Sequence, residues 1–296
     1  MIIKFWGVRG SIPVPGLETA VYGGNTSCIQ IIHNDKIFII DAGSGIRKLG
    51  EFLKSHNQNF DVYLFLTHTH WDHIQGLPFF SPIFDYRYRI FIHGPSMLGK
   101  LKNMVSGQMG YIYFPVKVDD LASYLEFREL QRETFTIGDV KISTIYIYHP
   151  TACLGYSFED GKSKVVMLFD FEVDISQNEI LSGDYFIQML RIIGKENVLS
   201  FEEILEFANN ADVLIIDAQY TKEEYKTKKG WGHSSIPSAI NFALKAKAKR
   251  TVLFHLDPGR TDEDMMLIEH YLTNYFRMKN IKMEIYVARE GMEIKV

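Results

Sequence analysis

The segment His68-Thr69-His70-Trp71-Asp72-His73 carries four side chains that can bind a metal ion within six residues. It follows the apolar run Asp61–Leu66, which is typical of a buried strand, so the segment lies on the turn that leaves this strand. Imidazole nitrogens combined with a carboxylate suit zinc, manganese or iron. Because four ligands on one turn cannot close round a single ion without strain, we expect two ions, with further ligands from other strands.

Other apolar runs in the chain end in the same way. The runs that most clearly predict strands are Lys36–Ile40, Asp61–Leu66, Val140–Tyr148, Lys164–Phe169, Asp212–Ile216 and Thr251–Phe254. The residues that follow these runs, in one case after Thr67, are Asp41, His68, His149, Asp170, Asp217 and His255. In layered α/β proteins, ligands bind outside the carboxyl ends of the strands. We therefore expect these six residues to converge on one site.

The composition is that of a globular protein: 296 residues are 46% apolar and 23% charged, and the net charge is −4. The sequence predicts helices over Gly45–Lys54, Phe201–Asn209, Ile236–Lys247 and Asp262–Phe276. The length allows either two domains or one large α/β domain with insertions. The aromatic-rich and proline-rich stretch at about 79–132 is interpreted as an insertion, and a second insertion is expected at about 172–200.

Several features indicate the cellular setting. The N-terminal MIIKFWGVRG lacks the basic flank and long apolar stretch of a signal peptide, and no apolar run is long enough to predict a membrane span. The only cysteines are Cys28 and Cys153, too few for a disulfide framework, so we expect a reducing cytoplasm. The mildly acidic balance argues against wholesale coating of nucleic acid.

The H-x-H-x-D-H block, with Asp41-Ala42-Gly43 before it and His149, Asp170 and His255 after it, resembles the metallo-β-lactamase fold superfamily of binuclear metallohydrolases. Within this superfamily, the chain looks like a branch of metal-dependent hydrolases and phosphodiesterases. The stretches that carry this likeness are FWGVRGSIPVPG, YGGNTSC, HIQGLPFFSP, GWGHSS and HLDPGRTDE. That branch is related to the RNase Z-type transfer-RNA endonucleases and to cyclic-phosphate phosphodiesterases. The resemblance covers nearly the whole chain and implies a single domain over residues 1–296. It also implies a four-layer αββα sandwich, with helices outside two sheets.

The resemblance also implies a ligand set. One ion would be bound by His68, His70 and His149, and the other by Asp72, His73 and His255. Asp170 would bridge the two ions, with Asp174 or Glu172 as alternatives, because Phe169 stands where many superfamily members have glycine. Asp41 would orient a ligand histidine. The metal could be zinc, manganese or iron, since this donor set accepts all three.

A second feature is Asp217, followed by His233 in the sequence GWGHSS. In RNase Z-like phosphodiesterases an acidic residue and a histidine at these places form a proton-donating pair, and a phosphodiester's leaving group needs such a proton. His233 as a cap of the next helix, and Asp217 as a structural residue at a strand end, are the alternatives. The expected catalytic residues are His233, Asp217 and Asp72.

The resulting prediction is hydrolysis of a small or cyclic phosphodiester, such as a cyclic nucleotide, by a metal-bridged hydroxide. Arg9 is a candidate phosphate contact. One alternative is an RNase Z-type RNA endonuclease, with RNA as its partner. Another is a di-iron redox or oxygen-sensing protein on the same fold, but His70 argues against it because flavodiiron-type proteins carry glutamate there. Since relatives commonly dimerise, a homodimer is a further expectation.

Overall fold

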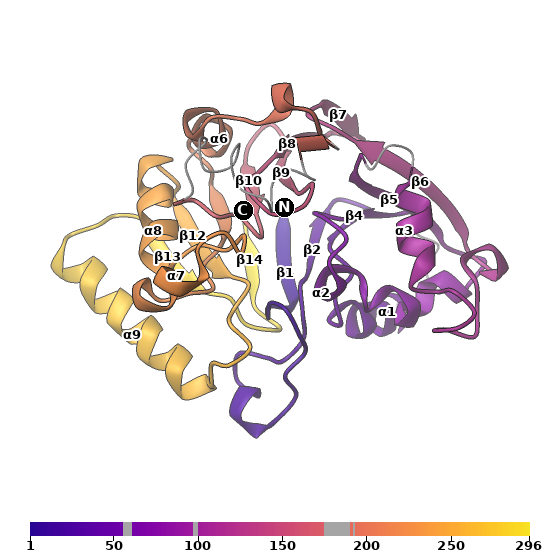
Figure 1. Cartoon of the computed structure of the whole chain (residues 1–296), viewed down its shortest axis with the longest axis horizontal. Coiled ribbons are helices and arrows are strands. Elements are labelled where there is room, and N and C mark those ends of the chain that lie inside the picture. Colours follow the sequence, from indigo (N-terminus) through magenta and orange to yellow (C-terminus); the bar gives the residue numbers. More distant parts are fainter. Residues whose placement is uncertain (56–60, 97–99, 175–189, 192) are drawn as a thin grey trace.

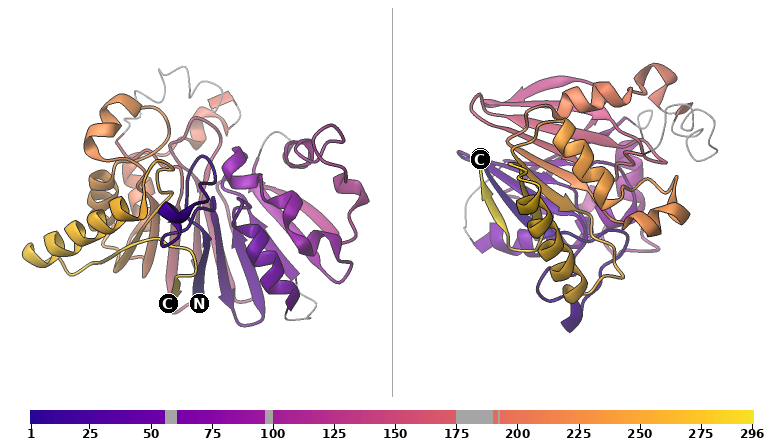
Figure 2. Two further views of the ribbon diagram at one scale, coloured as in Figure 1. Left: turned by 90° about the horizontal axis from the view of Figure 1, so that it is seen from below. Right: turned by 90° about the vertical axis from the view of Figure 1, so that its left-hand side faces the viewer.

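Two β-sheets face each other at the centre of the molecule, and helices cover their outer sides (Figures 1 and 2). This computed structural model describes residues 1–55, 61–96, 100–174, 190–191 and 193–296. Within these ranges each sheet has seven strands. The order in the first sheet is β14 (Glu293–Lys295), β1 (Ile2–Gly7), β2 (Cys28–His33), β3 (Lys36–Ile40), β4 (Asp61–Phe65), β5 (Arg89–Pro95) and β6 (Tyr124–Leu130). The order in the second is β13 (Glu284–Val287), β12 (Arg250–Phe254), β11 (Val213–Asp217), β10 (Lys164–Leu168), β9 (Leu154–Glu159), β8 (Val140–Tyr146) and β7 (Thr134–Ile137).

Each sheet contains a block of four parallel strands. These blocks are β3 to β6 in the first sheet and β10 to β13 in the second, with registers such as Ile40 opposite Phe65 and Leu168 opposite Ile216. The remaining strand pairs are antiparallel. Since parallel strands end at a common edge, the residues that follow them lie at the same edge of each sheet.

The central strands are buried on both faces, as their continuous apolar sequences predict. In β3, Phe38 and Ile40 point into the core between the sheets, and Ile37 and Ile39 point to the outer layer of helices. All four side chains are at most 5% exposed. Successive side chains of β3 therefore pack alternately into the core between the sheets and into the apolar layer under the helices.

The helices form the outer layers. On the first sheet these are α1 (Ile46–Ser55), α2 (Trp71–Ile74) and α3 (Leu101–Gly107); on the second they are α6 (Phe201–Ala208), α7 (Lys222–Lys228), α8 (Ile236–Lys245) and α9 (Asp262–Met278). Short 3-10 turns occur at Leu17–Thr19, Leu77–Phe79, Ser81–Phe84, Val118–Asp120 and Lys195–Asn197. Thr261 caps α9 and accepts a hydrogen bond from the backbone of Asp264, while Asp264 bonds back, so this predicted capping box is confirmed. The four-layer αββα sandwich is confirmed.

The six predicted strands and four predicted helices are all present, with ends shifted by one or two residues except in Lys36–Ile40, which matches. None of the helices in the described ranges is both long enough and apolar enough to cross a bilayer.

Residues 79–132 contain more regular structure than their weak periodicity suggests. They provide β5 and β6, which continue the parallel block of the first sheet, and α3, which packs on β6. This stretch is therefore part of the sheet itself. Most of the second expected insertion, at about 172–200, lies outside the described residues. We infer that the chain is a single domain, because the core between the sheets draws side chains from both of them.

One buried histidine makes the stability of this fold depend on pH. His93 in β5 is 6% exposed, and its ring stacks against those of Phe65 and Phe135, with ring centroids 4.6 and 6.0 Å away. Its Nδ1 donates to the backbone oxygen of Phe91. Burial, with the charge of Arg128 acting in the same direction, lowers the pKa of His93 to about 4. The neutral ring is therefore the form that the folded protein accommodates.

We predict that His93→Phe flattens the acid side of the stability profile. The unfolded chain takes up a proton below about pH 6.5 and the folded one only near pH 4, so His93 should cost about 2 kcal/mol of stability between pH 7 and pH 5. Urea unfolding at both pH values should show a loss about 2 kcal/mol smaller in the variant than in the parent protein, because other buried histidines such as His149 contribute equally to both. The exposed His270→Phe is the control, and an unchanged loss in His93→Phe would contradict the prediction.

Candidate metal centre

Six side chains that leave strand ends meet at one edge of the two sheets. Asp41 and His68 come from the ends of β3 and β4 in the first sheet. The second sheet contributes His149, Asp170, Asp217 and His255, from the ends of β8, β10, β11 and β12. All six are at most 1% exposed. The convergence predicted from the sequence is therefore present, and both sheets contribute to it.

The backbone at three of these strand ends is left-handed. The φ angles of Asp41, Asp170 and His255 are 62°, 51° and 61°. This conformation costs a residue other than glycine about 1 kcal/mol. Strain of this kind persists where the surrounding structure fixes the chain, and it concentrates at functional sites. Here it turns the chain sharply at the strand end, next to the clustered side chains.

The first cluster consists of His68, His70, His149 and one oxygen of Asp170. His149 Nε2 lies 3.2 Å from His70 Nδ1. Asp170 Oδ2 lies 3.5 Å from His68 Nε2 and 3.8 Å from His149 Nε2. His70 is the exposed member, so the cluster is open to solvent on the side of that residue.

The second cluster consists of Asp72, His73, His255 and the other oxygen of Asp170. Asp170 Oδ1 lies 3.2 Å from both His73 Nε2 and His255 Nε2. Asp72 Oδ2 lies 3.3 Å from His73 Nε2 and 3.2 Å from His255 Nε2. The two carboxylate oxygens of Asp170 are thus divided between the two clusters, as a bridging ligand requires.

These residues fit divalent cations. Two ligand atoms of a tetrahedral ion with bonds of about 2.0–2.1 Å lie about 3.3 Å apart, close to the separations found in both clusters. Within the described part of the chain, His68 Nε2 and Asp170 Oδ1 are buried and have no hydrogen-bond partner. Burial also lowers the pKa of His149 to about 3, so its ring is neutral, the form that binds a metal. A cation in each cluster would satisfy the unpaired atoms.

In two of these histidines, His73 and His149, the other ring nitrogen is fixed by a neighbouring oxygen. His73 Nδ1 donates to Asp41 Oδ2 at 2.7 Å, and Asp41 is itself held by the Thr67 and Ser27 hydroxyls. His149 Nδ1 donates to the Gly232 backbone oxygen at 3.1 Å. These bonds place the proton on Nδ1 and leave the Nε2 lone pair directed at the cluster.

Two contacts from the N-terminal loop, made by Ser11 and Gly10, complete the surroundings of the second cluster. The backbone N–H of Ser11 donates to Asp72 Oδ2 at 2.6 Å. A Cβ atom on Gly10 would lie 2.4 Å from the His255 ring, so only glycine allows this approach. Neither contact has a recognisable signal in sequence, because both depend on the path of a loop distant from Asp72 and His255.

His233 and Asp217 form a pair beside both clusters. His233 Nδ1 lies 2.8 Å from Asp217 Oδ2, and the Ser234 backbone N–H donates to Asp217 Oδ1. Burial opposes protonation of His233, but the carboxylates of Asp217 and Asp170 outweigh it and raise its pKa to about 9. Cations in the clusters would act in the opposite direction. The cap of α8 is Ser235, so the alternative reading of His233 as a helix cap is wrong.

The two alternative bridging residues lie outside the clusters. Glu172 is buried and accepts hydrogen bonds from the backbone of Gly230 and Gly232 and from the Tyr225 hydroxyl. Asp174 Oδ2 accepts from the Ser238 hydroxyl. Glu172 thereby anchors the loop that carries His233, a role that the sequence did not reveal.

The suggestion that Arg9 contacts phosphate is wrong. Arg9 is fully buried, and its guanidinium donates to the backbone oxygens of Gly23, Asp257 and Arg260. It ties the N-terminal loop to the loop after β12. Because the Arg9 guanidinium is buried in these contacts, it cannot reach a ligand in solvent.

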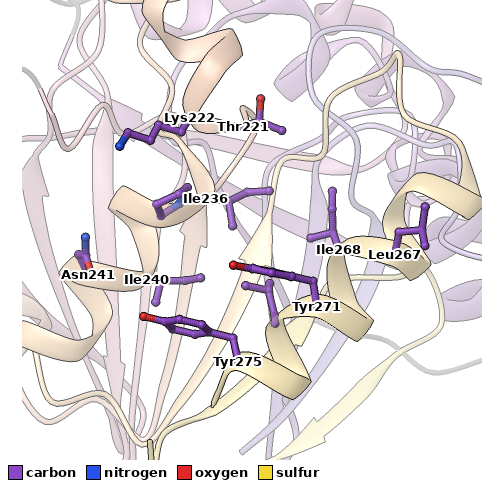
Figure 3. Close-up of a pocket in the computed structure, with 11 residues that line it drawn as sticks. Thr221, Lys222, Ile236, Ile240, Asn241, Leu267, Ile268, Tyr271 and Tyr275 are labelled. Atoms are coloured by element: carbon purple, nitrogen blue, oxygen red, sulfur yellow. The ribbon is translucent and has the colours of Figure 1, made fainter. Parts of the chain in front are cut away.

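An apolar pocket of about 550 Å³ lies between α8 and α9, with Ile240, Tyr271 and Tyr275 on its walls (Figure 3). None of the clustered His and Asp residues lines it. The open side of the metal centre and this pocket are therefore separate features.

We predict that Asp170→Asn lowers the metal content well below two ions per chain, because one of the two clusters loses a charged oxygen. Elemental analysis of dialysed protein measures this. Asp174→Asn, which changes a nearby carboxylate outside the clusters, is the matched control and should keep two ions. Full occupancy in Asp170→Asn would move the bridging role to another carboxylate.

Comparison with known proteins places this geometry in context. A Ribonuclease Z from Picrophilus torridus is 26% identical over 99% of this chain and 95% of the relative. The metallo-β-lactamase fold protein YhfI from Bacillus subtilis has a TM-score of 0.65 and 17% identity, covering 99% of this chain and 98% of that one. A diphosphatase of the PhnP family has a TM-score of 0.66 and 18% identity, covering 100% and 97%.

These likenesses confirm the metallo-β-lactamase fold that the H-x-H-x-D-H block indicates. The family model described as Anti-Pycsar protein Apyc1 matches residues 19–231, well over half of the chain. The chain therefore belongs to the Anti-Pycsar protein Apyc1 family, on the metallo-β-lactamase fold.

Proposed function

We propose that this protein hydrolyses a small or cyclic phosphodiester, such as a cyclic nucleotide, at the two metal-binding clusters. The observation that carries the proposal is the division of the Asp170 carboxylate between two groups of buried imidazoles, with the His233–Asp217 pair alongside. A centre of this kind suits a phosphoryl group, which carries charge on several oxygens and needs both an attacking and a leaving oxygen to be stabilised.

The relatives also support metal-dependent hydrolysis of phosphodiester bonds. The chain is a metal-dependent hydrolase of phosphodiester bonds, related along nearly its whole length to a protein named Ribonuclease Z and folded like a diphosphatase. It binds divalent metal ions through its His and Asp cluster.

The proposed roles follow the geometry. His68, His70 and His149 hold one ion, Asp72, His73 and His255 hold the other, and Asp170 contributes to both. Ions bound there supply a nucleophile at neutral pH and neutralise charge on the phosphoryl oxygens. Asp41 keeps the His73 ring in the orientation and tautomer that a ligand needs. Asp72 has a second role, because it ties the Ser11 loop to the site.

His233 is proposed as the general acid. Its side chain keeps 12% exposure, whereas the ligand histidines beside it, His149 and His255, keep at most 1%. Its ring stacks against that of His255 with centroids 4.8 Å apart, so a proton at Nε2 lies at the edge of the metal centre. Asp217 accepts from Nδ1 and stabilises the charged ring. The leaving oxygen of the phosphodiester takes the Nε2 proton.

RNA is the second candidate substrate, and the relatives named Ribonuclease Z favour it. The net charge of −4 favours a small substrate, because gripping an RNA backbone needs a broad basic surface. Competition between a cyclic nucleotide and a precursor transfer RNA for the same protein separates the two. The expected homodimer and the expected cytoplasmic location stay predictions.

We predict that His233→Ala reduces kcat/KM by about 10²–10⁴-fold for substrates with alkyl leaving groups, which depart only when protonated. The loss should be much smaller for p-nitrophenyl esters, whose leaving group is stable as an anion. Steady-state rates on matched pairs of substrates measure the difference, and Asp217→Asn should show the same trend. Equal losses on both classes would remove His233 from the acid role.

A further inference from the structure

The apolar pocket between α8 and α9 is a cavity that the proposed function leaves unused. Its volume of about 550 Å³ falls within the range of about 300–1,000 Å³ that is typical of small-molecule sites. No residue of the two metal-binding clusters lines it. Figure 3 shows that α9 forms one wall and α8 the other, and that the rings of Tyr271 and Tyr275 extend from α9 toward α8.

The wall that α9 provides is apolar but lies in water. Leu267 and Tyr271 are 64% and 66% exposed. The rings of Tyr271 and Tyr275 are stacked, with centroids 6.2 Å apart and an angle of 17° between their planes. Because residues four apart on a helix share a face, these three side chains form one continuous strip. Apolar side chains that gather on one face, rather than lie scattered, are typical of a surface that binds another molecule.

The wall that α8 provides is fixed in place. Ile236 and Ile240 lie one turn apart on this helix and are 8% and 7% exposed. The Ile236 N–H donates to the Tyr220 backbone oxygen at 2.7 Å, and Ser235 caps the helix. The rest of α8 packs on β11 and β12 of the second sheet. This side of the pocket is therefore formed before a ligand arrives, which lowers the entropy cost of binding.

A single charged side chain, Lys222, is found among the described residues that line the pocket. Lys222 begins α7 and makes no ion pair with any residue in the described part of the chain. Two other lysines of α7 differ from it, since Lys226 pairs with Glu223 and Lys228 with Asp257. The lining residues include no carboxylate. The pocket thus combines apolar walls with one uncompensated positive charge.

We propose that the α8–α9 pocket binds a small amphipathic carboxylate from solution, with its apolar body against Ile240 and Tyr271 and its carboxylate at Lys222. The apolar body would remove the exposed strip of α9 from water, which is the main source of binding free energy in such a site. The negative head group complements the unpaired lysine and sets the orientation of the ligand. This binding activity goes beyond phosphodiester hydrolysis, because the pocket is separate from the metal centre.

The test measures binding of hexanoate, octanoate and decanoate to the metal-loaded protein by isothermal titration calorimetry, at concentrations below micelle formation. Each methylene group removed from the chain should weaken binding by about two- to fourfold, because less apolar surface is buried. Decyltrimethylammonium, which has the same chain as decanoate but a positive head group, should bind more weakly than decanoate. Metal-stripped protein should bind decanoate as tightly as the metal-loaded protein does.

Variants of exposed residues separate the walls from the charge. Leu267→Gln and Tyr271→Gln should each weaken decanoate binding by about 5- to 50-fold, because they remove apolar wall. Lys222→Glu should weaken it by about 2- to 30-fold and should not weaken binding of decyltrimethylammonium. Met266→Gln and Lys226→Glu are the matched controls, since both residues lie outside the pocket on the same helices, and they should bind decanoate as the parent does.

Four outcomes would overturn the proposal. The first is no binding of decanoate, or equal binding by Leu267→Gln and its control Met266→Gln. The second is loss of binding when the metal is removed, which would place the carboxylate at the metal centre. The third is binding to phosphatidylglycerol vesicles without binding to dissolved decanoate, which would assign the pocket to a lipid surface. The fourth is a dimer in sedimentation velocity that Leu267→Gln converts to monomer, which would assign this face to a second copy of the chain.

Discussion

The shared carboxylate of Asp170 is the constraint on which the rest of the site depends. It is buried, its two oxygens face two separate groups of imidazoles, and one oxygen has no hydrogen-bond partner among the described residues. Burying an ionised carboxylate costs several kcal/mol unless opposite charge compensates it. Protonated rings supply part of that charge, because the surrounding carboxylates raise the pKa of His73 and of His233. A divalent ion in each group would supply it with the ligand imidazoles neutral, so the arrangement suits a metal centre.

The two sheets serve to hold this carboxylate in place. One group of ligands comes largely from the turn after β4 in the first sheet, and Asp170 comes from β10 in the second. The core packed between the sheets sets the distance between them, so metal binding and packing are coupled. The left-handed turns at Asp41, Asp170 and His255 use part of the stability of that core to fix the chain at the strand ends.

Around the metal centre, hydrogen bonds hold the loops that carry the site residues in place. Glu172 pins the loop that carries Trp231 and His233, and the same loop fixes the His149 ring through the Gly232 oxygen. One buried carboxylate thus supports both a metal ligand and the proposed acid. Arg9 acts in a similar way on the N-terminal loop, which reaches Asp72 through Ser11.

Most of the fold and the clustered residues could be predicted from sequence, because apolar runs and strand-end His and Asp residues are local signals. The strands β5 and β6 were harder, since prolines and scattered aromatics mask the alternation in residues 79–132. The roles of Glu172, Ser11 and Arg9 could not be predicted, because each depends on contacts between segments far apart in the chain.

The most direct test of the metal-centred account is hydrolysis of bis(p-nitrophenyl) phosphate by metal-stripped protein, with Mn²⁺, Zn²⁺ and Fe²⁺ returned one at a time. The account predicts no turnover in the stripped protein and turnover restored by at least one of these ions. Two ions bound per chain with no turnover under any condition would contradict phosphodiester hydrolysis and favour the redox alternative on the same fold.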